Sequence, residues 1–456
     1  MEEKKYLKGW QKAVYGLGDF GGNFCYTFVS SFVMLYLSNI VGLDTGIVGV
    51  LMLISKITDG ISDVFFGSIM DRTQFKSGKA KPWLFMAILP LAVTVLLEFT
   101  IPNMESTLQY LYFFVVYTLM NSVFFTILNI SYNTLTVLVT KNATERVQMG
   151  VWRYVFALAA AMGISIATPI LVTSLGGDVN AWRTIALVYA VILTVACLPA
   201  VICVKELSPE ELYDTKTNLQ ERPRFIDSLM TLFTNKYFLV LLGINIFVNM
   251  GNTIANTAGS YYTIYVLGNF NIYGMFSMAG MLPMIIGLFL TPVFVQKYGM
   301  YKTNVMSLLI AFMLGIPYIL VGKLKMIPIM LGLLAIRGVF TSPIVGTLNA
   351  LAAEASRNVF LKTKKRMEGS MFACTTMGVK VGSGVGTALA GWLLSIAHYD
   401  GAAQVQPQSA TQMIEMMYIV LPVVAILVEL LFVLGLKVEK ENKELEAMAN
   451  TVVTGK

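Results

Sequence analysis

Long apolar segments separated by short polar linkers run through almost the whole chain. Each is about 20 residues or more, enough for an α-helix to cross a hydrocarbon core about 30 Å thick. They are continuously apolar and do not alternate, which favours helices over the strands of a β-barrel. The pattern predicts an all-α polytopic membrane protein with about twelve transmembrane helices. The segments centre near residues 25, 58, 91, 123, 162, 195, 250, 283, 312, 340, 385 and 424.

The composition agrees with a membrane setting. Only 13% of the 456 residues are charged, 56% are hydrophobic, and the mean hydropathy is +0.69. A soluble domain has about 25% charged residues, so this chain has too little polar surface to cover a water-soluble particle. It has a single histidine, His398, and no spacing typical of a metal centre or of a nucleophile with its base. We therefore expect a protein that is not an enzyme and carries no cofactor.

Basic residues are concentrated in alternate linkers. "DRTQFKSGKAKPW" at 71–83, "TKNATERVQ" at 140–148 and "FLKTKKRMEG" at 360–369 are rich in Lys and Arg, whereas "SNIVGLDTG" at 38–46 and "LGNFNIYG" at 267–274 have none. Basic loops stay on the cytoplasmic side, so we expect a multi-pass protein of the inner (plasma) membrane with both termini cytoplasmic. The net charge of +7 lies in these short loops, which argues against nucleic-acid binding.

A polar segment, "KELSPEELYDTKTNLQERPRFIDS", divides the apolar segments six and six. The linker after the second segment, "GSIMDRTQFKSGKAKP", resembles the linker after the eighth, "TPVFVQKYGMYKTN". Duplicated six-helix halves are typical of secondary transporters. We therefore predict an N-terminal six-helix bundle at 1–205, a cytoplasmic central linker at 206–228, a C-terminal six-helix bundle at 229–437 and a cytoplasmic tail at 438–456.

Three charged residues interrupt the second apolar segment, "SKITDGISDVFFG" at 55–67. Asp59 and Asp63 are four apart and share one face of a helix, with Lys56 close to that face. A charge at membrane depth costs several kcal/mol unless it is paired or meets water. Two interpretations follow. The two carboxylates are the ligands of a monovalent cation, Na⁺ or H⁺, or Lys56 and Asp59 form a structural ion pair while Asp63 reaches toward the cytoplasm.

Further polar residues lie at membrane depth in other segments. Arg153 and Lys380 fall in corresponding segments of the two halves, so both are candidates to line one central cavity, where they would donate hydrogen bonds to hydroxyls or to a carboxylate. The alternative for each is a structural tie to a neighbouring acid. Glu354 and Arg337, in the tenth segment, either pair with each other or act at a gate. The remaining positions are Asp19, Asn23, Thr126, Asn129 and Asn133.

Several motifs together resemble the glycoside–pentoside–hexuronide:cation symporters, a melibiose-permease-like family of the major facilitator superfamily. They are "YGLGDFGGNF", "ITDGISDVFFGSIMDRTQFKSGKAKPW", "NISYNTL…TERVQMGVWRYVFA" and "KRMEGSMFACTTMGVKVGSGVGTALAGW", in the family's order along nearly all of the chain. The resemblance implies the major facilitator fold, with twelve helices in two six-helix pseudo-repeats. It also implies cation-coupled symport of a sugar by alternating access. A lipid or lysolipid carrier from a related branch is the alternative.

The resemblance also implies roles for individual residues. Asp59 and Asp63 match the family's cation-binding aspartates, and Thr126 matches a threonine that assists them. Ser62 stands where an asparagine is usual, so Na⁺ and H⁺ both remain open as coupling ions. Arg153, Lys380 and Thr376 match positions of the substrate cavity.

Departures from the family pattern concern the substrate. Asn23 and Asn129 stand where melibiose-permease-like members have sugar-binding aspartates, and Asn133 stands where they have a tryptophan that stacks on the sugar. Galactoside specificity is therefore not expected. With two acids lost and Arg153 and Lys380 kept, an acidic glycoside such as a glucuronide becomes a hypothesis, while neutral xylosides and oligosaccharides stay open.

Overall fold

The computed structural model describes residues 5–73, 75, 78–207, 233–363, 368–403 and 405–454. Across these residues nearly all of the secondary structure is helical, and the β-type pairing is an isolated bridge between Phe75 and Gly78. The predicted all-α fold class is confirmed. Most of the predicted central linker, 206–228, lies outside the described residues.

The chain forms two compact units that do not follow a single cut in the sequence. Unit 1 comprises Met1–Leu219, Gly259–Gly274 and Thr387–Met413, and unit 2 comprises Gln220–Ala258, Met275–Gly386 and Ile414–Lys456. The predicted bundle boundaries remain a prediction.

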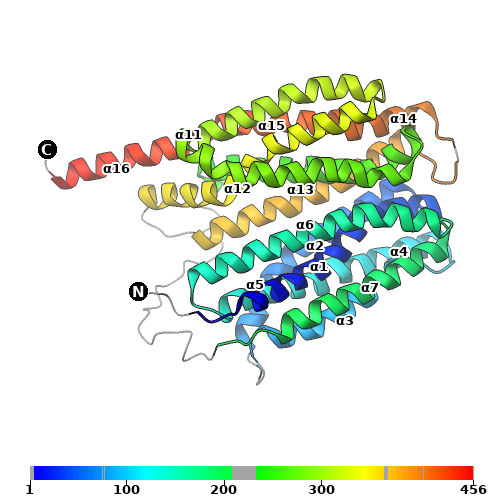
Figure 1. The fold of residues 1–456 in the computed structure, drawn as a ribbon, viewed down its shortest axis with the longest axis horizontal. Coiled ribbons are helices and arrows are strands. Elements are labelled where there is room, and N and C mark those ends of the chain that lie inside the picture. Colours follow the sequence, from blue (N-terminus) through cyan, green and yellow to red (C-terminus); the bar gives the residue numbers. More distant parts are fainter. Residues whose placement is uncertain are drawn as a thin grey trace. The chain divides into compact units, whose positions relative to one another are not determined.

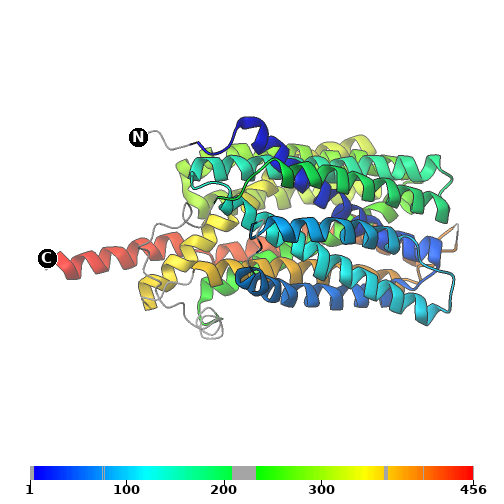
Figure 2. The same cartoon turned by 90° about the horizontal axis from the view of Figure 1, so that it is seen from below.

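The first part of unit 1 contains seven labelled α-helices and two π-helical turns. Helix α1 packs along both α6 and α7, and α7 also packs along α3 (Figures 1 and 2). The π-helical turn η2 joins α4 to α5 without a break. The elements are α1 Gly9–Tyr36, η1 Leu37–Val41, α2 Thr45–Arg72, α3 Lys81–Glu98, α4 Ser106–Thr118, η2 Leu119–Phe125, α5 Thr126–Leu138, α6 Ala143–Ser174 and α7 Val179–Ile202.

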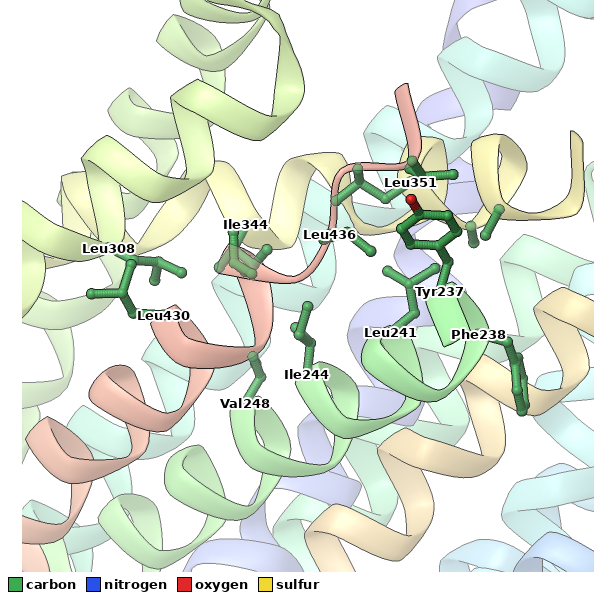
Figure 3. Packing of buried hydrophobic residues seen from close by; sticks show 14 of the residues in the cluster. Tyr237, Phe238, Leu241, Ile244, Val248, Leu308, Ile344, Leu351, Leu430 and Leu436 are labelled. Carbon is green, nitrogen blue, oxygen red and sulfur yellow. The ribbon is translucent and has the colours of Figure 1, made fainter. Parts of the chain in front are cut away.

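The second half of the chain is also helical. Apolar residues of α10, α11, α12 and α15 form a buried core in unit 2, which includes Tyr237, Leu308, Ile344 and Leu430 (Figure 3). The elements are α10 Lys236–Tyr261, η3 Tyr262–Val266, η4 Phe270–Ile272, α11 Tyr273–Lys323, α12 Ile327–Thr363, α13 Glu368–Ile396, α14 Gln408–Glu415, η5 Met416–Val420, α15 Leu421–Leu434 and α16 Val438–Thr454.

Ten helices among the described residues are long and apolar enough to cross a membrane. Helix α11 spans the segments predicted near 283 and 312, because it joins two helices at a kink where Gly299 has a φ of 77°. Helix α2, which carries Asp59 and Asp63, is not among the ten. The major facilitator fold does not depend on this count, and twelve transmembrane helices remain a prediction.

Many large apolar side chains point away from the core. Phe289 is 77% exposed and Ile202 is 66% exposed. Such side chains on the outside of long helices are what a hydrocarbon environment requires, since lipid tails replace the water that would otherwise penalise them.

In each half of the chain, a glutamate accepts hydrogen bonds from backbone N–H groups at the start of a helix. The carboxylate of Glu206, just after α7, accepts hydrogen bonds from the backbone N–H groups of Lys79 (2.6 Å) and Lys81 (2.8 Å) at the start of α3. Glu439, just after α15, accepts from the N–H groups of Met300 (3.2 Å) and Tyr301 (2.9 Å), directly after the kink in α11. Each acid satisfies donors that a helix N-terminus leaves open. The same device therefore occurs at matching places in both halves.

Candidate cation and substrate sites

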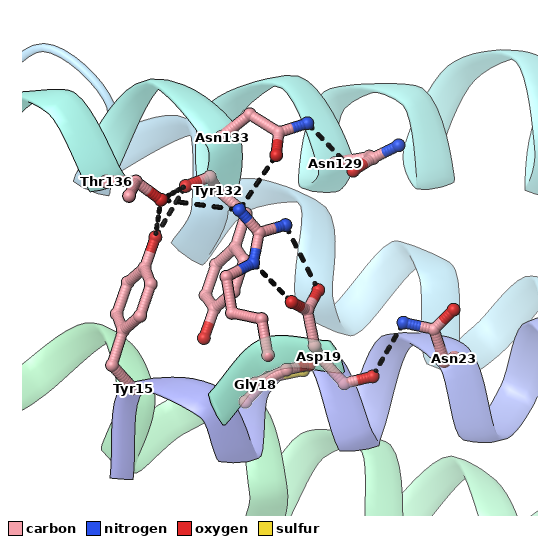
Figure 4. Close-up of polar contacts among 10 residues, drawn as sticks. Tyr15, Gly18, Asp19, Asn23, Asn129, Tyr132, Asn133 and Thr136 are labelled. Atoms are coloured by element: carbon pink, nitrogen blue, oxygen red, sulfur yellow. Dashed lines mark hydrogen bonds and ion pairs between the residues drawn. The ribbon is translucent and has the colours of Figure 1, made fainter. Parts of the chain in front are cut away.

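The first polar cluster joins α1 to α6. The Arg153 guanidinium donates two hydrogen bonds to the Asp19 carboxylate: Nε donates to Oδ2, and Nη2 donates to Oδ1 at 3.3 Å (Figure 4). Each side chain is 16% exposed. A two-pronged Arg–carboxylate contact fixes orientation as well as charge, so the Arg153 charge is compensated within unit 1.

The same guanidinium also reaches α5. Its Nη1 donates to Asn133 Oδ1 at 2.8 Å and to Thr136 Oγ1 at 3.3 Å. Asn133 Nδ2 in turn donates to Asn129 Oδ1 at 3.1 Å (Figure 4). Both asparagines are exposed although they lie in an apolar stretch of sequence. Their amides are therefore accessible donors and acceptors beside a neutralised ion pair.

Two tyrosines hold this cluster in place. The Tyr15 hydroxyl donates to the Tyr132 carbonyl at 2.6 Å and lies 2.9 Å from Thr136 Oγ1, and the two rings stack with centroids 4.5 Å apart. The Arg153 guanidinium carbon lies 4.7 Å from the Tyr132 ring centroid, a cation–π distance. Our sequence reasoning missed Tyr15, Tyr132 and Thr136. Tyr15 is four residues before Asp19, and Tyr132 and Thr136 are three residues after Asn129 and Asn133, so helical spacing from these residues was the available signal.

Five predicted substrate residues thus come together on α1, α5 and α6. The fifth, Asn23, donates through Nδ2 to the Asp19 carbonyl at 2.9 Å, one turn back on α1 (Figure 4). The other two predicted substrate residues, Thr376 and Lys380, lie on α13 in unit 2, where Thr376 is exposed and Lys380 is half-buried. The role of each residue in binding substrate stays a prediction.

The carboxylate pair of α2 lies at a second polar cluster. Asp59 is buried, and its Oδ1 accepts a hydrogen bond from Thr126 Oγ1 at 2.7 Å. Ser62 donates to the Asp59 backbone carbonyl at 2.9 Å, so its hydroxyl proton is directed at its own helix. Asp63 is half-buried. Oxygen atoms of these residues are the hard ligands that suit Na⁺, and the carboxylates equally accept a proton.

A buried lysine lies next to this cluster. Lys56 Nζ donates to Tyr26 Oη at 3.2 Å and to Asn121 Oδ1 at 3.1 Å, and it lies 4.8 Å from the Tyr26 ring centroid. The backbone carbonyl of Asn121 lies 3.2 Å from the Thr126 hydroxyl, which shares its proton between this carbonyl and Asp59. A chain of contacts therefore runs from Lys56 through Asn121 and Thr126 to Asp59, and a structural role for Lys56 beside Asp59 stays open.

The two gate candidates of α12 do not pair with each other. They are 17 positions apart, which is about 25 Å along a helix. Glu354 instead accepts from Asn442 Nδ2 at 2.8 Å and lies 3.8 Å from Arg357. The guanidinium of Arg337 is buried 4.7 Å from the Tyr318 ring centroid. The prediction that Glu354 and Arg337 pair with each other was wrong, because side chains this far apart on one helix cannot meet. A role for either residue at a gate stays a prediction.

The fold and these clusters define the class of the protein. Long helices with apolar exteriors and with charged residues held in polar clusters between the helices are typical of membrane transporters. Solved structures show the same fold: this chain has a TM-score of 0.64 with the nucleoside transporter NupG, covering 94% of this chain and 99% of that one at 14% identity. For a bacterial homologue of the human lysosomal transporter Spinster the TM-score is 0.70, with 96% and 99% covered at 12% identity. The chain has the major facilitator fold.

The family follows from the sequence comparison. Residues 14–440 match the family described as MFS/sugar transport protein, and the chain belongs to it. It is 24% identical to the inner membrane symporter YicJ of Escherichia coli (strain K12), over 91% of this chain and 89% of YicJ. It is 27% identical to the isoprimeverose transporter of Lactiplantibacillus pentosus, over 93% and 88%. The resemblance inferred from the motifs is confirmed.

Proposed function

We propose that this protein carries a glycoside, pentoside or hexuronide sugar across the inner (plasma) membrane together with a monovalent cation. The observation that carries the proposal is the buried Asp59 carboxylate, held by Thr126 one helical turn from Asp63 in a segment that the sequence predicts to cross the membrane. A charged group there is expensive unless a cation or a proton offsets it. Names of relatives point the same way, since a relative 24% identical over 91% of this chain is a putative glycoside/cation symporter.

The proposed mechanism uses differential affinity. Binding of Na⁺ or H⁺ at Asp59 and Asp63 neutralises the pair, and the sugar then binds beside α1, α5 and α6. Occupancy of both sites favours one orientation of the carrier over the other, which is sufficient for coupled transport. In this proposal both termini and the basic linkers lie on the cytoplasmic side, which the distribution of Lys and Arg favours.

Within this range of sugars, the polar cluster on α1, α5 and α6 favours a neutral glycoside over an acidic one. The acidic-glycoside hypothesis depended in part on an uncompensated Arg153, and Asp19 compensates that charge. What the cluster then offers is a set of amides, from Asn129 and Asn133, which suit sugar hydroxyls because each amide both donates and accepts. The names of relatives do not decide between the two, since they include both an isoprimeverose transporter and a glucuronide carrier protein homologue.

Uptake into proteoliposomes tests the proposal. We expect accumulation of isoprimeverose or methyl β-xyloside driven by an inward gradient of Na⁺ or of H⁺, and little uptake of methyl glucuronide. Asp63→Asn should lose the gradient-driven part, because it removes one of the two acids. Glu105→Gln is the matched control, since Glu105 is exposed and caps α4 without a side-chain hydrogen bond. Gradient-driven uptake by Asp63→Asn at the wild-type rate would contradict the cation role.

The same vesicles separate the lipid alternative. A lysolipid added to the outer leaflet should not be translocated faster than in protein-free vesicles. Faster lysolipid movement, with no sugar accumulation under either gradient, would favour the lipid carrier.

A further inference from the structure

Glu98 is a buried acid that the transport proposal does not use. It is the last residue of α3 and is 0% exposed. Neither of its carboxyl oxygens has a hydrogen-bond partner among the described residues. An ionised carboxylate without partners in such a place is far more expensive than the neutral acid, so a group like this keeps its proton.

The surroundings of Glu98 are aromatic on one side. The next residue, Phe99, stacks on Phe28 and Trp182 with centroids 4.2 Å and 5.8 Å away. The Phe99 carbonyl accepts from Tyr36 Oη at 3.1 Å, which ties the end of α3 to α1. This packing holds the end of α3, which carries Glu98, within unit 1.

On the other side, four titratable groups lie within electrostatic range of Glu98. They are Cys25 on α1, Lys56 on α2, and Tyr112 and Tyr117 on α4. Helices α5 and α7 and the turn η2 also pack against α3, and α7 brings Arg183, the residue after the Trp182 whose ring stacks on Phe99. Lys56 is the cation among the four groups, and it is also the lysine that reaches Asp59 through Asn121 and Thr126.

We propose that Glu98 is a proton-binding site, linked electrostatically through Lys56 to the carboxylate pair of α2. One proton binds to or leaves the Glu98 carboxyl group, and nothing else is exchanged. Because a proton at Glu98 and a cation at Asp59 both add positive charge around Lys56, each disfavours the other. The ionised form of Glu98 therefore favours cation binding, and the protonated form opposes it. Only this last step rests on the proposed symport; the proton site does not.

Infrared spectroscopy of the full-length protein in nanodiscs tests the site without sugar, added cation or transport. At neutral pH we expect the carbonyl-stretch band of a protonated carboxyl group that accepts and donates no hydrogen bond. Glu98→Gln should lose that band. Glu429→Gln is the matched control, because Glu429 on α15 is another buried acid and lies in unit 2. A band unchanged in Glu98→Gln, or absent from the wild type, overturns the proposal.

A second measurement guards against misfolding of Glu98→Gln. Wild-type protein labelled with ¹³C-glutamate should show the same band at lower frequency, and the shifted band should persist in Glu429→Gln. A band that the label does not move belongs to another residue type and overturns the assignment.

The link to Lys56 is tested by Lys56→Met. Removing the nearby positive charge should let Glu98 hold its proton to a higher pH, so the pH at which the band disappears should rise by about one unit or more. An unchanged midpoint in a folded Lys56→Met protein overturns the link. Since none of these measurements involves a sugar, failure here and failure of sugar symport are separate results.

Discussion

Gly18→Ala tests how tightly the substrate cluster is packed. A Cβ at Gly18 would lie 2.6 Å from Tyr132 Oη and 2.8 Å from two carbons of the ring. The ring cannot simply retreat, because it stacks on Tyr15 at 4.5 Å and lies 4.7 Å from the Arg153 guanidinium. The added methyl group must therefore displace the ring that supports Arg153.

The magnitude follows from two opposing terms. Forcing a methyl group into a packed site costs about 1–3 kcal/mol, while Gly→Ala in a helix returns up to about 1 kcal/mol. We expect Gly18→Ala to be net destabilising by about 1 kcal/mol. Displacement of Arg153 and Asn133 should weaken sugar binding about tenfold, equivalent to about 1.4 kcal/mol.

The assay compares melting temperature and sugar affinity for Gly18→Ala and Gly150→Ala in nanodiscs. Gly150 is one turn before Arg153 on α6, and a Cβ there would meet nothing within 4 Å. This control should melt at or above the wild-type temperature and bind sugar normally. If Gly18→Ala matches Gly150→Ala in both measurements, the packing argument for the cluster is refuted.

Three further predictions concern single contacts. Thr126→Val should weaken the affinity for the cation about tenfold, whereas Thr126→Ser should retain it, because losing a hydrogen bond to a charged group costs about 1.5–3 kcal/mol. The affinity is measured from the melting temperature as a function of cation concentration. Arg153→Lys should lower sugar affinity, because an ammonium group cannot donate the same pair of parallel hydrogen bonds to Asp19. Equilibrium binding of the sugar measures this. Burial of Glu145 opposes ionisation, but hydrogen bonds from Thr140, from Lys12 and from two backbone N–H groups outweigh it and lower its pKa. Its stabilisation is therefore full above its unfolded pKa of about 4.3 and is lost as pH falls through the lower folded value, so Glu145→Gln should flatten the fall of melting temperature in acid.

The sequence predicts the helices well because their apolar length is a property of each segment alone. It also identifies Asp59, Asn129 and Arg153 as unusual, since each is polar at membrane depth. It does not give their partners. Asp19 and Arg153 are 134 positions apart, and which acid meets which base depends on how α1 packs on α6. Glu98 was overlooked for a related reason: a lone acid at the end of an apolar segment has the same appearance in sequence whether it is buried or at the interface.

Both polar clusters of unit 1 involve one continuous helical stretch, η2 followed by α5. Asn121 and Thr126 belong to the cation cluster, while Asn129 and Asn133 belong to the substrate cluster. Thr126 and Asn129 are three residues apart, about 4.5 Å along the axis. A cation that binds at Asp59 beside the Thr126 hydroxyl therefore acts on the helix that carries the amides. Since coupling between two binding sites is reciprocal, a substitution that weakens it must reduce the effect of sugar on cation affinity and of cation on sugar affinity by the same factor.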